Sequence, residues 1–201
     1  MLQNKENLEK KFDHLFEQIS SSAFLRMESI GGEVPFYITT HLPENQNLAA
    51  QLIAALIKKL ETHGVSVLEV NLYELSLEII QREDDLEDLF EEEKSTPKPE
   101  FLETMQAILD VETEVMPAIA KKIKETDYHV LFITGVGQVF PFIRSHTILN
   151  NLQRIAKDAP TVMFFPGNYN GTSLELFGRL KDDNYYRAFN LDSLNLRQNN
   201  I

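Results

Sequence analysis

The residues with the clearest potential for chemistry follow an apolar run, His129 to Ile133, that ends in a glycine-containing turn. A buried strand ending in such a turn places the next residues at the carboxyl end of a sheet, where open α/β proteins usually bind ligands and partners. An arginine can hold a carboxylate or phosphate in a bidentate fork, and we expect Ser145 to cap the following helix. The candidate binding residues of this segment are Thr134, Gly135, Gly137, Arg144, Ser145 and His146.

A purely structural explanation competes with binding at these positions. A tight strand-to-helix turn that needs positive φ accounts for both glycines, and the third glycine of a dinucleotide fingerprint is missing. An internal ion pair with a carboxylate explains Arg144 as well as a ligand or partner does. The turn alone therefore predicts a site without deciding its chemistry.

Nucleotide hydrolysis is not expected from this sequence. The loop after the first expected strand, Thr39 to Asn47, lies where a P-loop would be, but it has neither the glycines nor the lysine that bind phosphates, and it contains Glu44. The third expected strand ends in Thr134 and Gly135 instead of the carboxylates that hold magnesium. We therefore predict that the protein does not hydrolyse ATP and is not an enzyme.

Other catalytic and metal sites are also not expected. The chain has no cysteine, and its five histidines show no H-x-x-x-H spacing. Ser145 and His146 are adjacent on the same expected helix, where successive side chains point about 100° apart and form a poor dyad. We predict no catalytic residue, no metal and no cofactor.

A second dense cluster lies near the end of the chain. Tandem aromatic residues beside an arginine are the types that dominate interface hot spots, although a buried edge strand whose tyrosine hydroxyls find internal partners explains them equally well. The candidate partner-binding residues of this cluster are Asp183, Asn184, Tyr185, Tyr186 and Arg187.

The two clusters are expected to meet at one end of the sheet. Thr161 to Phe165 is a fourth buried strand, and the helix Ile148 to Ala156 connects it to the third. A parallel crossover would bring the carboxyl ends of these strands, at Gly135 and Pro166, to the same rim. Arg144 would then stand beside Tyr169, which we add to the candidate binding residues.

Composition predicts one ordinary globular domain. The 201 residues are 43% hydrophobic and 25% charged, and no apolar run approaches the roughly 18 residues that a membrane span needs. We expect a single α/β domain over residues 1–201, opening with a helix over about residues 4–20, in a cytoplasmic protein. Strand and helix patterns alternate, which predicts three layers around a mainly parallel sheet of about five strands. A degenerate P-loop-like core is compatible with this order.

Negative charge is concentrated in the first part of the chain. The net charge is −12, and it divides into −14 for residues 1–128 and +2 for residues 129–201. Direct binding of nucleic acid is therefore not expected, whereas a basic protein partner suits the charge. The densest acidic stretch, about residues 83–100, contains two prolines and predicts an exposed and partly mobile excursion, the least ordered part of the chain. A solvated acidic helix or loop is the alternative.

Several blocks of the last third of the chain resemble one family. They are Thr134 to Gly137, Phe140 to His146, Phe164 to Tyr169, Leu176 to Gly178 and Asp183 to Phe189. Together they resemble the signature blocks of the B component of bacterial BREX phage-defence systems, the BrxB family. The first two thirds of the chain are less diagnostic.

The resemblance implies a function that the residues alone do not. It implies a cytoplasmic protein without established enzymatic activity, acting as an accessory or scaffold for other BREX components. The PglZ phosphatase-like protein is the first expected partner, and the DNA methyltransferase and large ATPase components are further candidates. The alternative is a nucleotide-binding switch or hydrolase that uses the rim around Thr134 and Arg144.

Overall fold

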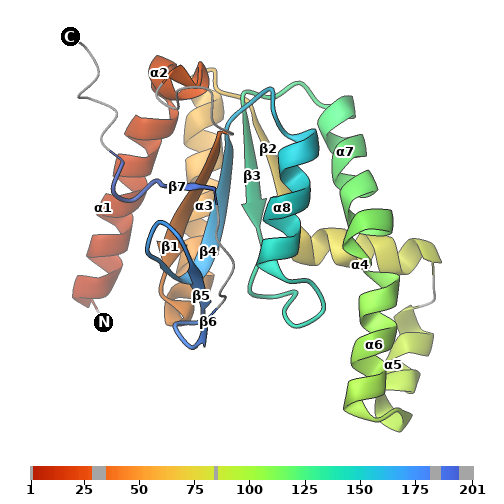
Figure 1. Ribbon diagram of the computed structural model, residues 1–201. Helices are drawn as coiled ribbons and strands as arrows, with labels where there is room; N and C mark the ends of the chain where they lie inside the picture. The colour runs from red at the N-terminus through yellow and green to blue at the C-terminus, as the bar shows by residue number, and fades with distance from the viewer. Residues whose placement is uncertain (1, 29–34, 84–85, 182–186, 195–201) are drawn as a thin grey trace.

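Apolar runs spaced along the chain become a parallel sheet in the strand order β2-β3-β4-β1-β7 (Figure 1). The computed structural model describes residues 2–28, 35–83, 86–181 and 187–194. The last residues of β4 extend past the parallel sheet and pair antiparallel with β5, and β5 pairs with β6. The strands are β1 (Phe36–His41), β2 (Val67–Asn71), β3 (Val130–Thr134), β4 (Thr161–Tyr169), β5 (Leu174–Leu176), β6 (Leu180–Lys181) and β7 (Phe189–Asn190). The expected α/β class with a mainly parallel sheet is confirmed.

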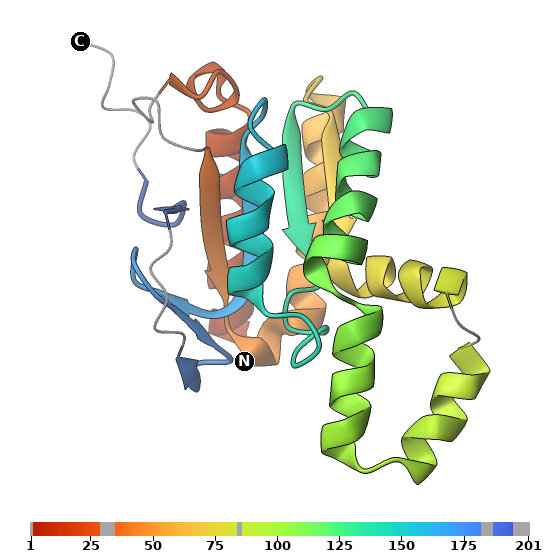
Figure 2. The same ribbon diagram turned by 45° about the vertical axis from the view of Figure 1, so that its right-hand side comes forward.

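Helices cover both faces of the sheet and give the three expected layers (Figures 1 and 2). One face is covered by α1 (Leu2–Ile19), α2 (Ser22–Leu25) and α3 (Gln46–Thr62). The other is covered by α4 (Leu72–Glu83), α7 (Met116–Glu125) and α8 (Ser145–Ile155). A helical pair, α5 (Leu86–Ser95) and α6 (Lys98–Ile108), projects beyond the carboxyl end of the sheet. Two short turns, the 3-10 helix η2 (Pro43–Asn45) and the π-helix η3 (Val111–Val115), complete the elements.

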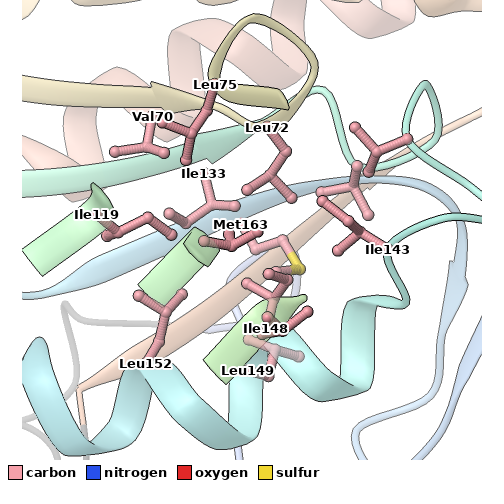
Figure 3. Close-up of a cluster of buried hydrophobic side chains, with 14 of the residues drawn as sticks. Val70, Leu72, Leu75, Ile119, Ile133, Ile143, Ile148, Leu149, Leu152 and Met163 are labelled. Carbon is pink, nitrogen blue, oxygen red and sulfur yellow. The ribbon is translucent and has the colours of Figure 1, made fainter. Parts of the chain in front are cut away.

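Strand β3 is apolar at every position because both of its faces are buried. Val130 and Phe132 face the α1 and α3 side, whereas Leu131 and Ile133 face the α4, α7 and α8 side. In Figure 3, Ile133 and Met163 of the sheet lie against Ile148, Leu149 and Leu152 of α8 and Ile119 of α7. The sheet is thus the shared wall of two apolar cores.

The opening helix α1 packs one apolar stripe on the body. Leu8, Phe12, Leu15 and Ile19 are all buried and recur at helical spacing. The ring of Phe12 stacks on that of Phe164 in β4, with centroids 6.1 Å apart. The first helix is therefore part of the apolar core on the α3 side of the sheet.

The described residues of the acidic stretch are mostly helical, in α5 and α6, so the alternative of an acidic helix describes them better than the least ordered part of the chain. Apolar residues at helical spacing inside it, Leu86, Leu89 and Phe90, give α5 one face that packs on α6 and the larger core. Pro97 and Pro99 fall at the start of α6, where prolines do not interrupt helical hydrogen bonds. Most other side chains of this pair are exposed, as expected, and its mobility stays a prediction.

Candidate functional site

The carboxyl ends of the central strands meet at one end of the sheet, the lower end in Figure 1. β1 stays in register with β4 as far as His41 and Pro166, and β3 pairs with β4 through Ile133 and Met163. The turn after β3 reaches the same place, because a Cβ atom on Gly137 would lie 2.7 Å from Cγ of Pro166. The prediction that this turn and Pro166 share one rim is confirmed.

Thr134 and Gly135 are occupied by contacts inside the fold. Thr134 is buried, and its Oγ1 donates a 2.7 Å hydrogen bond to Oε1 of Glu69 on β2. Gly135 has a φ of +72°, and a Cβ atom there would lie 2.3 Å from Oδ1 of Asn71. That oxygen accepts hydrogen bonds from the backbone N–H groups of Tyr73 and Glu74 at the start of α4. The glycine therefore lets the turn pass close to the start of α4.

Gly137 is explained by crowding. A Cβ atom there would lie 2.9 Å from the ring of Phe177 as well as 2.7 Å from Pro166. Its φ is outside the left-handed region, so the prediction that both glycines need positive φ is wrong for this one. Both glycines serve close packing at the rim, the first also through its backbone conformation.

The helix after the turn begins one residue earlier than a Ser145 cap would require. Ile143 donates its backbone N–H to the carbonyl of Val139 at 3.0 Å, and Arg144 then adopts an extended conformation with φ −99° and ψ 135°. An N-cap residue has such a backbone, so the cap position falls at Arg144. Ser145 is the first residue of α8, and the prediction that it is the N-cap is wrong.

A cavity of about 270 Å³, which we call the rim pocket, is lined by the last three residues of the first predicted cluster, Arg144, Ser145 and His146. The loop after β3, the start of α8, the end of β4 and the β5–β6 hairpin all contribute to it. Its apolar floor is covered by polar side chains on one side and by the hairpin on the other. It is lined by Val136, Phe140, Ile143, Arg144, Ser145, His146, Phe165, Leu174, Leu176, Leu180 and Lys181.

The surface around the rim pocket combines exposed apolar side chains with positive charge. Phe140 is 36% exposed, and Leu180 and Leu42 are each 43% exposed. Arg144 is exposed and forms no ion pair within the described part of the chain, and Lys181 stands on the hairpin opposite. Exposed apolar groups beside cationic side chains are typical of a surface that binds another protein.

Tyr169, the last residue of β4, has a structural role. Its ring is buried, and its hydroxyl donates a 2.7 Å hydrogen bond to the carbonyl of Ala188. It does not line the rim pocket with Arg144, and it instead anchors the segment in which Arg187 is exposed. Asp183, Asn184, Tyr185 and Tyr186 lie outside the described residues, so their predicted role in binding stays a prediction.

A second hollow of about 230 Å³ lies between the ends of β1, β2 and β3, and we call it the strand-end cleft. His41 is buried there, and burial lowers the pKa of its imidazole although a hydrogen bond with Gln46, at 2.9 Å, opposes this. Glu69 and Glu74 also line the cleft, and among its described lining residues there is no Lys or Arg. Two carboxylates without a cation make this cleft unsuitable for phosphate.

Sequence reasoning missed a third hollow, on the α4, α5 and α6 side. Its lining combines buried apolar residues with the exposed rings of Tyr73 and Phe90. The signal was present in the apolar spacing of Leu86, Leu89 and Phe90 within the acidic stretch, which the density of carboxylates obscured.

Together, these elements define a three-layer α/β protein with a mainly parallel sheet and a hollow beside Arg144 at the carboxyl ends of its strands. The family model for BREX protein BrxB matches residues 68–191, and the chain belongs to this family. A BREX protein BrxB of Bacillus cereus (strain H3081.97) is 36% identical over 188 residues, covering 92% of this chain and 97% of that protein. A second, of Escherichia coli O9:H4 (strain HS), is 24% identical over 92% of this chain and 91% of its own length. No solved structure gave a significant match.

No helix in the described part of the chain is long and apolar enough to cross a membrane. Nor do three or more His, Asp or Glu side chains of those residues gather in a group that could hold a metal ion.

Proposed function

We propose that this protein is a non-enzymatic accessory or scaffold of a BREX phage-defence system, and that it acts in the cytoplasm. Its partners would be other BREX components, first the PglZ phosphatase-like protein, with the methyltransferase and ATPase components as further candidates. Membership of the BrxB family supports the assignment to such a system.

The rim pocket supports docking of a protein over binding of a small molecule. Small-molecule pockets typically enclose roughly 300–1,000 Å³, and this one offers about 270 Å³ with exposed apolar side chains around it. The observation on which the proposal rests is Arg144, an exposed cation at the start of α8 that is next to Phe140 and Leu180 in the same pocket. An arginine beside exposed apolar side chains is a common interface anchor.

Substitutions at the rim test this proposal. Arg144→Ala and Phe140→Ala should each weaken partner binding by about 2 kcal/mol, or roughly 30-fold, because they remove an interface anchor. Lys58→Ala is the matched control, since Lys58 is exposed on α3 on the opposite face of the sheet. Pull-down of tagged protein with BREX components and phage plating measure the effect. Normal binding and full phage protection by both folded rim variants would reject the role of the rim.

The alternative, a nucleotide-binding switch or hydrolase around Thr134 and Arg144, has less support. Thr134 is hydrogen bonded to Glu69, and the strand-end cleft beside it is lined by carboxylates. We therefore propose that purified protein releases no phosphate from ATP and gains no thermal stability from nucleotides. A ligand at 100 times its Kd would add about 2.7 kcal/mol of stability, so a clear shift in Tm would support the switch instead.

A further inference from the structure

An apolar groove lies between α4 and the projecting pair α5 and α6, and we call it the helical groove (Figure 2 shows these three helices). Each helix gives it one face at helical spacing, and the loop after β3 closes one end. The lining residues are Tyr73, Ser76, Leu77 and Ile80 of α4, Leu86, Leu89, Phe90 and Glu93 of α5, Phe101 and Met105 of α6, Leu109, and Gln138, Val139 and Phe142 of the loop.

Two aromatic rings of the groove remain open to solvent. Phe90 is 54% exposed and Tyr73 is 43% exposed, which places both among the few large apolar side chains that the described part of the chain leaves exposed. Below them, Leu89 and Met105 are buried and belong to the larger core. Exposed aromatic rings above a closed apolar floor are typical of a site that receives side chains of a partner.

The segment of the chain that forms this groove is strongly acidic. Residues 72–108 contain twelve Asp or Glu and three Lys or Arg, a net charge of −9. Two of these cations are already paired, Arg82 with Glu114 and Lys94 with Glu91, and Glu93 lines the groove itself. A field of this sign repels nucleic acid and anionic lipid, and it opposes pairing with the same surface of a second copy. The complementary occupant is cationic.

The size of the groove favours anchor side chains over a whole ligand. Its volume of about 230 Å³ is below the roughly 300–1,000 Å³ of small-molecule pockets. The twelve residues of α4 extend about 18 Å, long enough to lie along three turns of another helix. An amphipathic helix placed on such a groove inserts apolar side chains at positions i, i+3, i+4 and i+7.

We propose that the helical groove binds a basic amphipathic helix of a partner protein, with apolar side chains seated against Phe90 and Tyr73 and Lys or Arg side chains facing the carboxylates of α5. This binding is distinct from docking at the rim pocket. The loop after β3 separates the two surfaces, because Val139 and Phe142 line the groove whereas Phe140 and Arg144 line the rim pocket.

Photo-crosslinking identifies the occupant directly. The probe is p-benzoylphenylalanine in place of Phe90 in the full chain, expressed in cells with the complete BREX operon, and mass spectrometry identifies the crosslinked peptide. The proposal expects a protein segment with an excess of Lys or Arg and apolar residues at helical spacing. Crosslinks only to nucleic acid, to lipid, to the same chain or to a segment without this pattern overturn it, and so does the absence of any crosslinked protein.

Titration of a synthetic copy of that peptide then tests the contacts. Phe90→Ala should raise its Kd roughly 30-fold, and Glu93→Lys should raise it at least about tenfold with a weaker dependence on salt. The matched control is Glu61→Lys, which makes the same charge change at an exposed position of α3 and should leave the Kd unchanged. Unchanged binding by Phe90→Ala and Glu93→Lys overturns the groove while leaving the Arg144 test of the rim unaffected.

Discussion

The rim pocket and the helical groove lie on either side of one loop, yet they are built in opposite ways. The rim pocket forms where strands end, and tight packing of glycines against Asn71 and Pro166 fixes its position. The charged residues among its lining are Arg144 and Lys181. The helical groove forms between helices that extend past the sheet, and its surroundings are strongly negative. The two proposals together predict that partner segments bound at the two surfaces do not compete.

The largest expected effect concerns the packing behind the rim. Gly135→Ala should destabilise the protein by roughly 2–5 kcal/mol, because the new Cβ meets Asn71 Oδ1 and the backbone stays at φ +72°. The start of α4, which also forms the groove, should loosen with it, since Asn71 holds the first N–H groups of that helix. Urea denaturation of the purified variant measures the loss.

A second glycine separates crowding from backbone strain. Gly64 has a similar φ of +80°, but a Cβ atom there would meet nothing within 4 Å. Gly64→Ala should therefore cost only the roughly 1–2 kcal/mol of the left-handed conformation. Equal losses for the two substitutions would show that the rim does not depend on the close approach of the turn to α4.

The next effect compares the dynamics of the two regions. Backbone amides of α5 should exchange with solvent about 100-fold faster than those of β3, because α5 buries Leu89 alone and projects from the body, whereas β3 is buried at every position. Hydrogen exchange with mass spectrometry resolves the two segments, and limited proteolysis should cut the acidic stretch first. Equal protection of α5 and β3 would make the helical pair part of the rigid core.

The strands could be predicted because their signal is local. The unbroken apolar runs of β3 and β4 reflect burial on both faces, and a parallel crossover placed their ends together. The helices of the acidic stretch were only the alternative, because the carboxylates suggested repulsion, whereas Leu86 and Leu89 pack α5 against its neighbours. Tertiary packing on one face outweighs the charge on the other.

The candidate site could be predicted only in part. Arg144 and His146 follow a recognisable turn and do line a pocket, but the opposite wall comes from Leu174, Leu176 and Leu180 of a hairpin far along the chain. No local pattern indicates that this hairpin folds over the start of α8. Tyr169 was placed beside Arg144 because the crossover brings Pro166 to the rim, but its ring is buried and its hydroxyl is hydrogen bonded to the carbonyl of Ala188.

The smallest expected effect separates the two regions by pH. Burial lowers the pKa of His41 at the sheet end, with Lys11 adding to the shift and Gln46 and Asp192 opposing it. On the helical side, Thr113 lowers the pKa of Asp110 by donating its backbone and side-chain hydrogen bonds to the carboxylate. In both cases the unfolded chain binds more protons than the folded chain, so each contribution is present above the ordinary pKa of the group and is lost as pH falls.

The two windows differ, which makes the assignment testable. The contribution of His41 should decline as pH falls below 6.5, and that of Asp110 only as pH falls below 3.8. His41→Gln should flatten the upper part of the curve of unfolding free energy against pH, and Asp110→Asn the lower part. A curve that keeps its slope below pH 6.5 in His41→Gln would show that burial of His41 in the strand-end cleft does not cause this part of the pH dependence.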